Sequence, residues 1–260
     1  MTPAQSVMRP NVSVLADADS LADAAAERIV AAAARAIDSH GRFVVALSGG
    51  STPRRTYERL AEPAIASRVK WPRVHVVWVD ERCVPPGDAE SNYRLARETL
   101  LDHVPIPAAN VHRMHGEDNP VAAAAFYERT LRTLFSTPSG APSTAPGKRI
   151  DLAVMGLGDN GHTASIFPGS VAIDERERWV MAERVSATPP WRITLTAPML
   201  DACAELLFLV VGGAKANVLH RVLDGPRQPR ELPAQLIAPT DGRAHWMVDR
   251  AAAAELAMPR

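Results

Sequence analysis

The chain has 260 residues, and its 29 basic and 29 acidic side chains cancel, so nucleic acid is not an expected partner. Two cysteines are too few for a disulfide framework, and neither a signal-peptide core nor a run of about 20 apolar residues is present. We therefore expect a cytoplasmic protein without a membrane partner, folded as a single α/β domain over residues 1–260 and present as a monomer or weak homo-oligomer.

The first part of the chain predicts two strands with a helix between them. Residues 11–15 read as a short strand, and the Ala-rich segment 21–37 places apolar residues at helical spacing. Gly41 is expected to end that helix, and residues 43–47 are apolar throughout, as in a strand that is buried on both faces. The candidate N-caps of the helix are Asp17, Asp19 and Ser20.

A glycine-rich loop follows the second strand and leads into a helix, with Ser51 or Thr52 as the expected cap and Pro53 at the first helical position. Free N–H groups, hydroxyl groups and glycines at a helix start favour phosphate binding. The composition also fits an ordinary capped turn, and residues 46–50 resemble the nucleophile elbow of a serine hydrolase. The candidate phosphate ligands are Ser48, Gly49, Gly50, Ser51 and Thr52.

The next strand, residues 74–79, ends in three charged residues, Asp80, Glu81 and Arg82. Three charges in a row at the carboxyl end of a buried strand suggest a site, because ligands of α/β sheets bind at that edge. An irregular loop rich in proline and glycine should come next.

Two further helices are expected, over residues 93–103, with Ser91 or Asn92 as cap, and over residues 120–135. Residues 137–148 are rich in Pro, Gly and Ser and contain little apolar material to bury. We expect a mobile surface loop there, inside the domain.

The stretch 151–169 combines a buried strand, a glycine-rich turn and a histidine. The turn is expected to place His162 at the carboxyl edge of the sheet, where it is a candidate catalytic residue. GLGDNG is a literal dinucleotide-binding pattern, but Pro168 leaves room for at most one helical turn after it, which argues against that function. The residues that support His162 in the turn are Gly156, Gly158, Asn160 and Gly161.

The last part of the chain predicts four strands, over residues 179–185, 192–197, 206–211 and 245–248, and an Ala-rich tail helix. Arg192 opens the second of these strands. Lys215 follows a glycine turn at a helix start, where the helix dipole disfavours a cation, so a bound anion is indicated.

Strand-to-helix turns at Ser48, Asp80, Gly156 and Gly212 alternate with helices along the chain. This alternation predicts an α/β fold with a doubly wound, mostly parallel sheet that carries helices on both faces, as in Rossmann-like proteins.

The four turns resemble those of the 6-phosphogluconolactonase family, which shares its fold with the glucosamine-6-phosphate isomerases and deaminases. The resemblance covers residues 43–223. HTASIFPG is typical of the lactonase branch, whereas the deaminase branch has a Glu where Phe167 stands. The family usually has Asp directly before Gly-His, and this chain has Asn160 there. The motifs are LSGGSTP at 47–53, VDERCVP at 79–85 with SNYRLARETLL after it, GLGDNGHTASIFPG at 156–169, and GGAKA at 212–216.

The resemblance implies hydrolysis of 6-phospho-D-glucono-1,5-lactone to 6-phospho-D-gluconate, the second step of the oxidative pentose phosphate pathway. His162 is the expected general base, Asp80 the residue that orients the imidazole or the water, and Arg82 a ligand of the oxyanion or the phosphate. Arg192 and Lys215 are expected to join the glycine loop in binding the phosphate.

Two other activities share this fold: deamination of glucosamine 6-phosphate, and sugar-phosphate sensing without turnover. The segment before residue 43 offers no DNA-reading pair of helices, which disfavours a sensor. No metal or organic cofactor is expected, because the eight histidines lack H-E-x-x-H spacing and no C-x-x-C motif is present.

Overall fold

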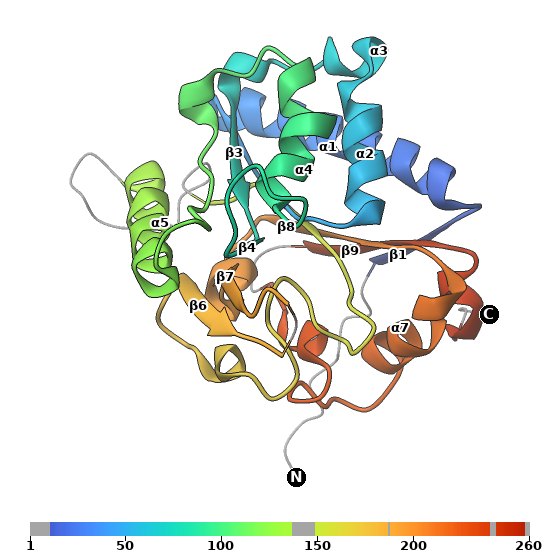
Figure 1. The fold of residues 1–260 in the computed structure, drawn as a ribbon. Coiled ribbons are helices and arrows are strands. Elements are labelled where there is room, and N and C mark those ends of the chain that lie inside the picture. Colours follow the sequence, from blue (N-terminus) through green and yellow to red (C-terminus); the bar gives the residue numbers. More distant parts are fainter. Residues whose placement is uncertain (1–10, 137–148, 187, 240–242, 258–260) are drawn as a thin grey trace.

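We describe the protein from a computed structural model, which covers residues 11–136, 149–186, 188–239 and 243–257 (Figure 1). The expected surface loop at 137–148 lies outside the described residues.

The main sheet has six strands in the order β1-β9-β8-β5-β2-β3, and all of its pairings are parallel. Every residue of β2, β5 and β8 is buried, which explains why β2 and β5 are apolar throughout and why β8 is apolar after Glu205. The six expected strands are confirmed within a few residues. Their bounds are β1 Asn11–Leu15, β2 Phe43–Leu47, β3 Val74–Trp78, β5 Leu152–Met155, β8 Glu205–Val210 and β9 Arg243–Asp249.

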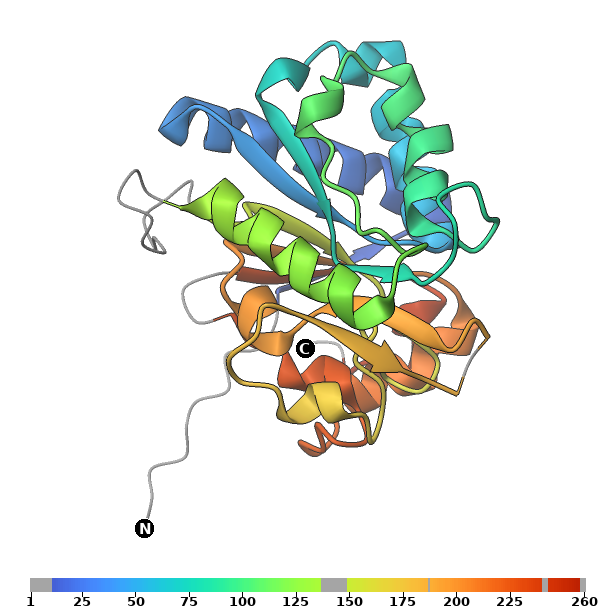
Figure 2. The same cartoon turned by 60° about the vertical axis from the view of Figure 1, so that its left-hand side comes forward.

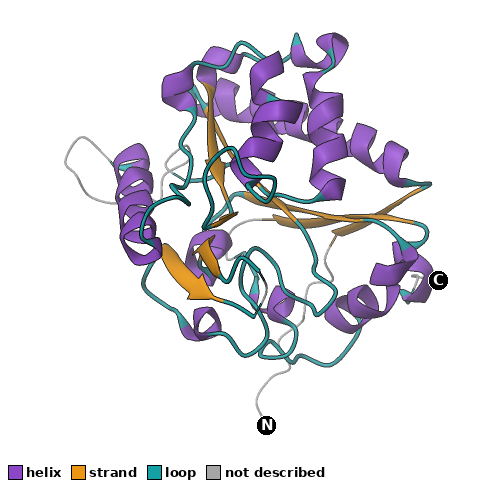
Figure 3. Cartoon of the chain, in the orientation of Figure 1, coloured by secondary structure: helices purple, strands orange, loops and turns teal. Residues whose placement is uncertain are grey.

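Helices lie on both faces of this sheet, as the sequence predicts. Helices α1, α2 and α4 cover one face, and α7 lies on the other (Figures 1 and 3). A short 3₁₀ turn, Gly213–Lys215, leads from β8 into α7, and another, Ala252–Glu255, follows β9. The helix bounds are α1 Ala18–His40, α2 Ser51–Ala61, α3 Pro63–Ala66, α4 Asn92–Thr99, α5 Pro120–Phe135, α6 Ala197–Asp201 and α7 Ala216–Leu223.

The ends of α1 form as expected, whereas three other helix ends differ. Asp17 caps α1 by accepting a bond of 2.8 Å from the Ser20 N–H, and Gly41 ends it with a φ of 83°. The expected cap of α2 is wrong, because Gly50 is the N-cap and Ser51 is already helical. Helix α4 stops at Thr99 before a separate 3₁₀ turn, and the expected tail helix is the 3₁₀ turn Ala252–Glu255.

A second, antiparallel sheet has the order β4-β7-β6, with bounds β4 Asp80–Arg82, β7 Trp191–Leu195 and β6 Val180–Arg184 (Figure 2). The expected loop and helix after β3 are present, but residues 80–82 form a short strand before that loop, which the sequence did not predict. Val79 joins the two sheets, because its N–H donates to the carbonyl of Leu47 (2.9 Å) and its own carbonyl accepts from Leu195 (2.8 Å).

Helix α5 packs against the second sheet, since it contacts both β6 and β7. The hydroxyl of its Tyr127 also accepts a bond of 2.8 Å from the backbone N–H of Trp78 at the end of β3. The helix thereby fixes the second sheet beside the carboxyl end of the main sheet.

The strand order reverses between β2 and β5. From β2 the chain moves outward to β3, and it then returns to the other side of β2 to form β5, followed by β8 and β9. In open α/β sheets, such a reversal leaves a crevice at the carboxyl ends of the two strands, and ligands bind there.

Candidate functional site

Three of the expected turns meet at this point of the sheet. Strands β8, β5 and β2 are neighbours, and their carboxyl ends lead into residues 212–215, 156–162 and 48–52, respectively. Segments that are far apart in sequence thus share one edge.

The loop after β2 is held from two sides. The Tyr57 hydroxyl donates to the carbonyl of Ser48 (2.9 Å) and accepts from its N–H (3.0 Å). A Cβ on Gly49 would lie 1.8 Å from Oδ1 of Asn92, so only glycine lets α4 approach this loop so closely. Oγ of Ser48 is buried and has no hydrogen-bond partner in the described part of the chain, which does not fit a nucleophile activated by a base.

The start of α2 is open to an anion. Gly50 has a φ of 108°, and among the described residues no side chain caps the helix. The N–H groups of Ser51 and Thr52 therefore lie at the positive end of the helix dipole, without a capping oxygen.

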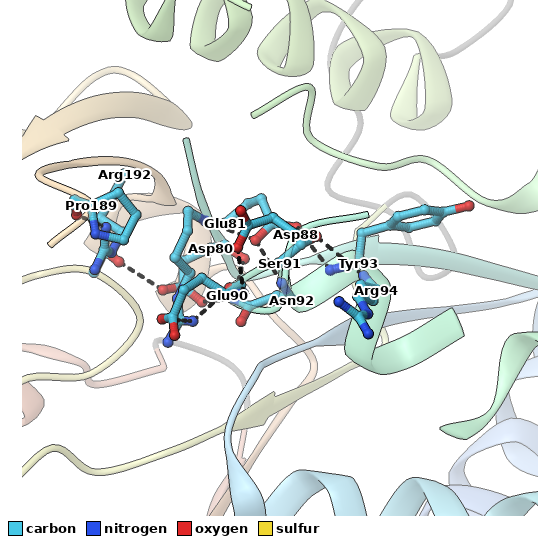
Figure 4. A network of polar contacts seen from close by, with 12 residues as sticks. Asp80, Glu81, Asp88, Glu90, Ser91, Asn92, Tyr93, Arg94, Pro189 and Arg192 are labelled. Atoms are coloured by element: carbon cyan, nitrogen blue, oxygen red, sulfur yellow. Dashed lines mark hydrogen bonds and ion pairs between the residues drawn. The ribbon is translucent and has the colours of Figure 1, made fainter. Parts of the chain in front are cut away.

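Strand β4 separates its three charges between its two faces, because successive side chains of a strand alternate. Glu81 is 2% exposed, and its carboxylate accepts bonds from the backbone N–H groups of Asn92 (2.7 Å) and Tyr93 (2.8 Å). It thereby stabilises the N-terminus of α4 and takes no part in the site (Figure 4).

Asp80 is buried on the opposite face and is fixed by two hydrogen bonds. Ser165 Oγ donates to Oδ2 (2.7 Å), and Asn92 Nδ2 donates to Oδ1 (3.1 Å). Asn92 and Ser165 were not among the site residues expected from sequence, although both belong to motifs that carried the resemblance. These contacts lock Asp80 between β4, α4 and the histidine turn.

Arg82 lies directly opposite Arg192 in the pairing of β4 with β7. Arg82 donates to the carbonyl of Glu90 (2.7 Å). Arg192 donates to the carbonyl of Pro189, which lies beside it in Figure 4. Burial lowers the pKa of Arg192, and the charge of Arg82 lowers it further. Like charges directly opposite each other in a sheet are unfavourable, so the binding of anionic groups beside the two guanidinium groups would relieve their repulsion.

The turn after β5 is shaped so that an imidazole lies over glycine. The Gly158 N–H donates to the carbonyl of His162 (2.8 Å), and the Gly161 N–H donates to the carbonyl of Gly158 (3.0 Å). A Cβ on Gly158 would lie 1.9 Å from Nδ1 of His162, and Gly161 has a φ of 80°. The carbonyl of Gly156 accepts from Oγ1 of Thr163 (2.8 Å) and closes the turn.

The His162 ring has one polar and one aromatic neighbour. Its Nδ1 lies 2.6 Å from Oδ1 of Asn160, and its face stacks on Phe167 with ring centroids 4.2 Å apart. Burial lowers the pKa of His162; Asp80 and Asp159 oppose this decrease, whereas Lys215 and Arg192 add to it. Charges from the second sheet, from the turn after β8 and from the histidine turn itself thus act on the imidazole.

Lys215 stands where the sequence predicts, between the turn after β8 and the start of α7. Its Nζ forms an ion pair with the carboxylate of Asp159, and this contact lowers the pKa of Asp159. Asp159 is highly exposed, so its carboxylate can leave when another anion binds.

Among the cavities of the described residues, one of about 480 Å³ is lined by residues that include Tyr93, His112 and Phe126, and another of about 270 Å³ by residues that include Cys83, Gly116 and Trp191. Neither is lined by His162, Asp80, Arg192 or Lys215, so the candidate site lies outside both cavities. Within the ranges that the structure describes, no group of three or more His, Cys, Asp or Glu side chains is arranged to hold a metal ion.

The helices in these ranges also include none that is long and apolar enough to cross a membrane.

Comparisons with known proteins bear on the family and the fold of this chain. The model of the glucosamine-6-phosphate isomerase/6-phosphogluconolactonase family matches residues 16–246. A 6-phosphogluconolactonase of Nostoc sp. is 38% identical over 252 residues, which cover 96% of this chain and all of the relative.

Solved structures show the same likeness. The crystal structure of 6-phosphogluconolactonase from Thermotoga maritima superimposes with a TM-score of 0.77 at 30% identity, covering 93% of this chain and 100% of the other. A monomeric glucosamine-6-phosphate deaminase has a TM-score of 0.77 at 18% identity, covering 94% and 99% of the two chains, which establishes a shared fold only.

Proposed function

The chain belongs to the glucosamine-6-phosphate isomerase/6-phosphogluconolactonase family, and on this premise we propose that it hydrolyses 6-phospho-D-glucono-1,5-lactone to 6-phospho-D-gluconate. The observation that carries the proposal is the convergence of Asp80, Arg192 and Lys215 on His162, whose Nδ1 edge is already bonded to Asn160. A base beside a cluster of cations suits a neutral electrophile that carries a phosphate.

We assign the phosphate to the start of α2 together with Lys215 and Arg192. The uncapped N–H groups of Ser51 and Thr52 favour an anion, and the exposed Asp159 is the group that the phosphate would displace from Lys215. Charge-assisted hydrogen bonds of this kind contribute about 1.5–3 kcal/mol each. Oγ and N–H of Ser48 are buried and turned toward the protein, so its part is to shape the loop.

In the proposed chemistry, Nε2 of His162 takes a proton from a water molecule while the water oxygen attacks the lactone carbonyl carbon. Arg82 stabilises the oxyanion that develops on the carbonyl oxygen. The bond from this carbon to the ring oxygen then breaks, and the imidazolium returns the proton to the ring oxygen, which becomes the hydroxyl of the open acid.

The contacts of Asp80 limit its role. Its two oxygens accept from Ser165 and Asn92, whereas Nδ1 of His162 is bonded to Asn160. We therefore assign Asp80 an electrostatic role: its charge favours the imidazolium that forms during the reaction.

The deaminase alternative is disfavoured by Phe167, which stacks on His162 and leaves no carboxylate at the position of the deaminase Glu. The second alternative, a sugar-phosphate sensor, binds its ligand without turnover and would need no general base, so a positioned His162 disfavours it as well. Both cysteines lie in the described chain and are free thiols, which supports a reducing compartment such as the cytoplasm as the place where the protein acts.

One experiment separates these functions. Freshly made lactone is followed by NMR or stopped flow with the wild type, His162→Gln and Ser48→Ala, and ammonia release is assayed with glucosamine 6-phosphate. We expect lactone hydrolysis that depends on His162 but not on Ser48 Oγ, and no ammonia. Absence of hydrolysis above the spontaneous rate would reject the proposed function.

A further inference from the structure

The hydrogen bonds of Asn160 define which nitrogen of His162 carries the proton. Oδ1 of Asn160 faces two groups of His162: the backbone N–H at 3.2 Å and Nδ1 at 2.6 Å. A backbone N–H can only donate, so the Asn160 atom between them is the carbonyl oxygen and not the amide nitrogen. Because that oxygen has no proton to give, Nδ1 must be the donor.

We propose that Asn160 is the positioning residue of His162: its neutral amide oxygen holds the ring in the Nδ1–H tautomer and leaves Nε2 as the base, without adding a negative charge beside the ring. The assignment rests on the proposed function for its catalytic meaning, but the tautomer follows from the two hydrogen bonds alone. Gly158 below the ring and Phe167 against its face restrict the same imidazole, so Asn160 selects the edge that is presented to substrate.

The neutrality of the amide matters because two negative and two positive side chains already act on His162. Asp80 faces it from β4 and Arg192 from β7, while Lys215 faces it from the turn after β8 and Asp159 from its own turn. A carboxylate at position 160 would lie within hydrogen-bond distance of Nδ1 and make the negative charges the majority. Asn160 thus keeps His162 unprotonated at a lower pH than a carboxylate would.

The first test is the tautomer itself, measured by ¹⁵N NMR of histidine-labelled protein above pH 8, with the His162 signals identified from their loss in His162→Gln. We expect the Nδ1–H form in the wild type and a mixture of tautomers in Asn160→Ala. A wild-type signal in the Nε2–H form would overturn the proposal. This readout needs no catalysis, so it stands even if the protein does not hydrolyse the lactone.

The second test is the pH dependence of kcat and of the His162 NMR shifts in two matched variants that change charge by one unit in the same turn. Asn160→Asp adds a carboxylate at the ring and should raise the pKa of His162 by about 1 unit or more. Asp159→Asn removes one and should lower it, because the Asp159 charge favours the imidazolium. An unchanged or lower pKa in Asn160→Asp would contradict the proposal.

Kinetics complete the assignment. Asn160→Ala should reduce kcat by about tenfold or more with KM nearly unchanged, since the wrong tautomer offers no lone pair to the water. Asn160→Asp should restore kcat at high pH because a carboxylate also accepts from Nδ1. Loss of kcat in both variants at every pH, with the Nδ1–H tautomer intact in Asn160→Ala, would show that Asn160 acts only on the shape of the turn and would reject a positioning role.

Discussion

The hydroxyl group of Tyr57 bonds to both backbone groups of Ser48: it donates to the carbonyl at 2.9 Å and accepts from the N–H at 3.0 Å. Both residues are buried, so neither backbone group has water as an alternative partner. One phenol on α2 therefore fixes the loop that precedes its own helix, and with it the N–H groups that we assign to the phosphate.

Tyr57→Phe removes both bonds without opening a large cavity. We expect a loss of about 1–3 kcal/mol in the free energy of unfolding, because two buried backbone groups lose their partner, together with a higher KM for the phosphorylated lactone. Tyr127→Phe is the control, since Tyr127 is also fully buried but makes a single bond, to the backbone N–H of Trp78 on β3, and none to Ser48. Urea unfolding should show a loss of stability in both variants, the larger in Tyr57→Phe because two bonds are lost there, and steady-state kinetics should show a change of KM in Tyr57→Phe alone.

His162→Gln should lower kcat by about 10²- to 10⁴-fold, the usual contribution of a general base. KM should change little, because the proposed phosphate ligands lie on other turns. Initial rates with fresh lactone at several pH values give both constants. Full activity in this variant would remove His162 from the chemistry.

The facing of Arg82 and Arg192 leads us to expect that replacing Arg192 weakens substrate binding without lowering the stability of the fold. Because they face each other with like charge, Arg192→Gln should leave the free energy of unfolding unchanged or raise it, while KM rises by tenfold or more. Arg132→Gln serves as a control: Arg132 pairs with Glu128 and stacks on Trp179, so its loss should cost stability and spare KM. Thermal unfolding and kinetics of the two variants decide between a structural and a functional arginine.

Lys215→Ala should raise KM for the phosphorylated lactone by tenfold or more, since one charge-assisted contact is lost. The same variant should hydrolyse unphosphorylated glucono-1,5-lactone as the wild type does, because the lost contact concerns the phosphate alone. An equal loss with both lactones would place Lys215 at the carbonyl end of the site.

The neutral form of His162, which can act as the base, should set the pH dependence of kcat. Burial lowers the pKa of His162 below its usual value of about 6.5, so the imidazole stays neutral and kcat should stay constant as the pH falls to about 6.5. At lower pH the imidazole becomes protonated, and kcat should decline. An acid limb of kcat that lies above pH 7 in the wild type would contradict this expectation.

The rings of His75 and His112 stack on each other away from the site, with their centroids 5.5 Å apart. Burial, reinforced by His112, lowers the pKa of His75 to about 4, and burial also lowers that of His112. As the pH falls from about 6.5, the unfolded chain takes up protons before the folded one, so stability is lost in this range. Urea unfolding between pH 7.5 and 4.5 should show a weaker pH dependence in His75→Gln than in the exposed control His103→Gln.

Much of this protein can be predicted from its sequence because local patterns report burial. The uninterrupted apolar runs of β2, β5 and β8 identify central parallel strands, and the glycines after them mark turns that need close approach or a positive φ. From these, a mostly parallel sheet with its turns at the carboxyl edge can be predicted, whereas the strand order that makes β8, β5 and β2 neighbours is seen only in the structure.

The tertiary structure decided the contacts between these turns. The three charged residues 80–82 have no apolar pattern, and they become strand β4 only because Trp191–Leu195 lies beside them, so the facing of Arg82 and Arg192 has no local signal. Asn160 likewise reads as a turn residue until its oxygen is seen between the backbone N–H and Nδ1 of His162. Such pairings depend on register between segments that only the folded chain brings together, and the side-chain period within one segment does not encode it.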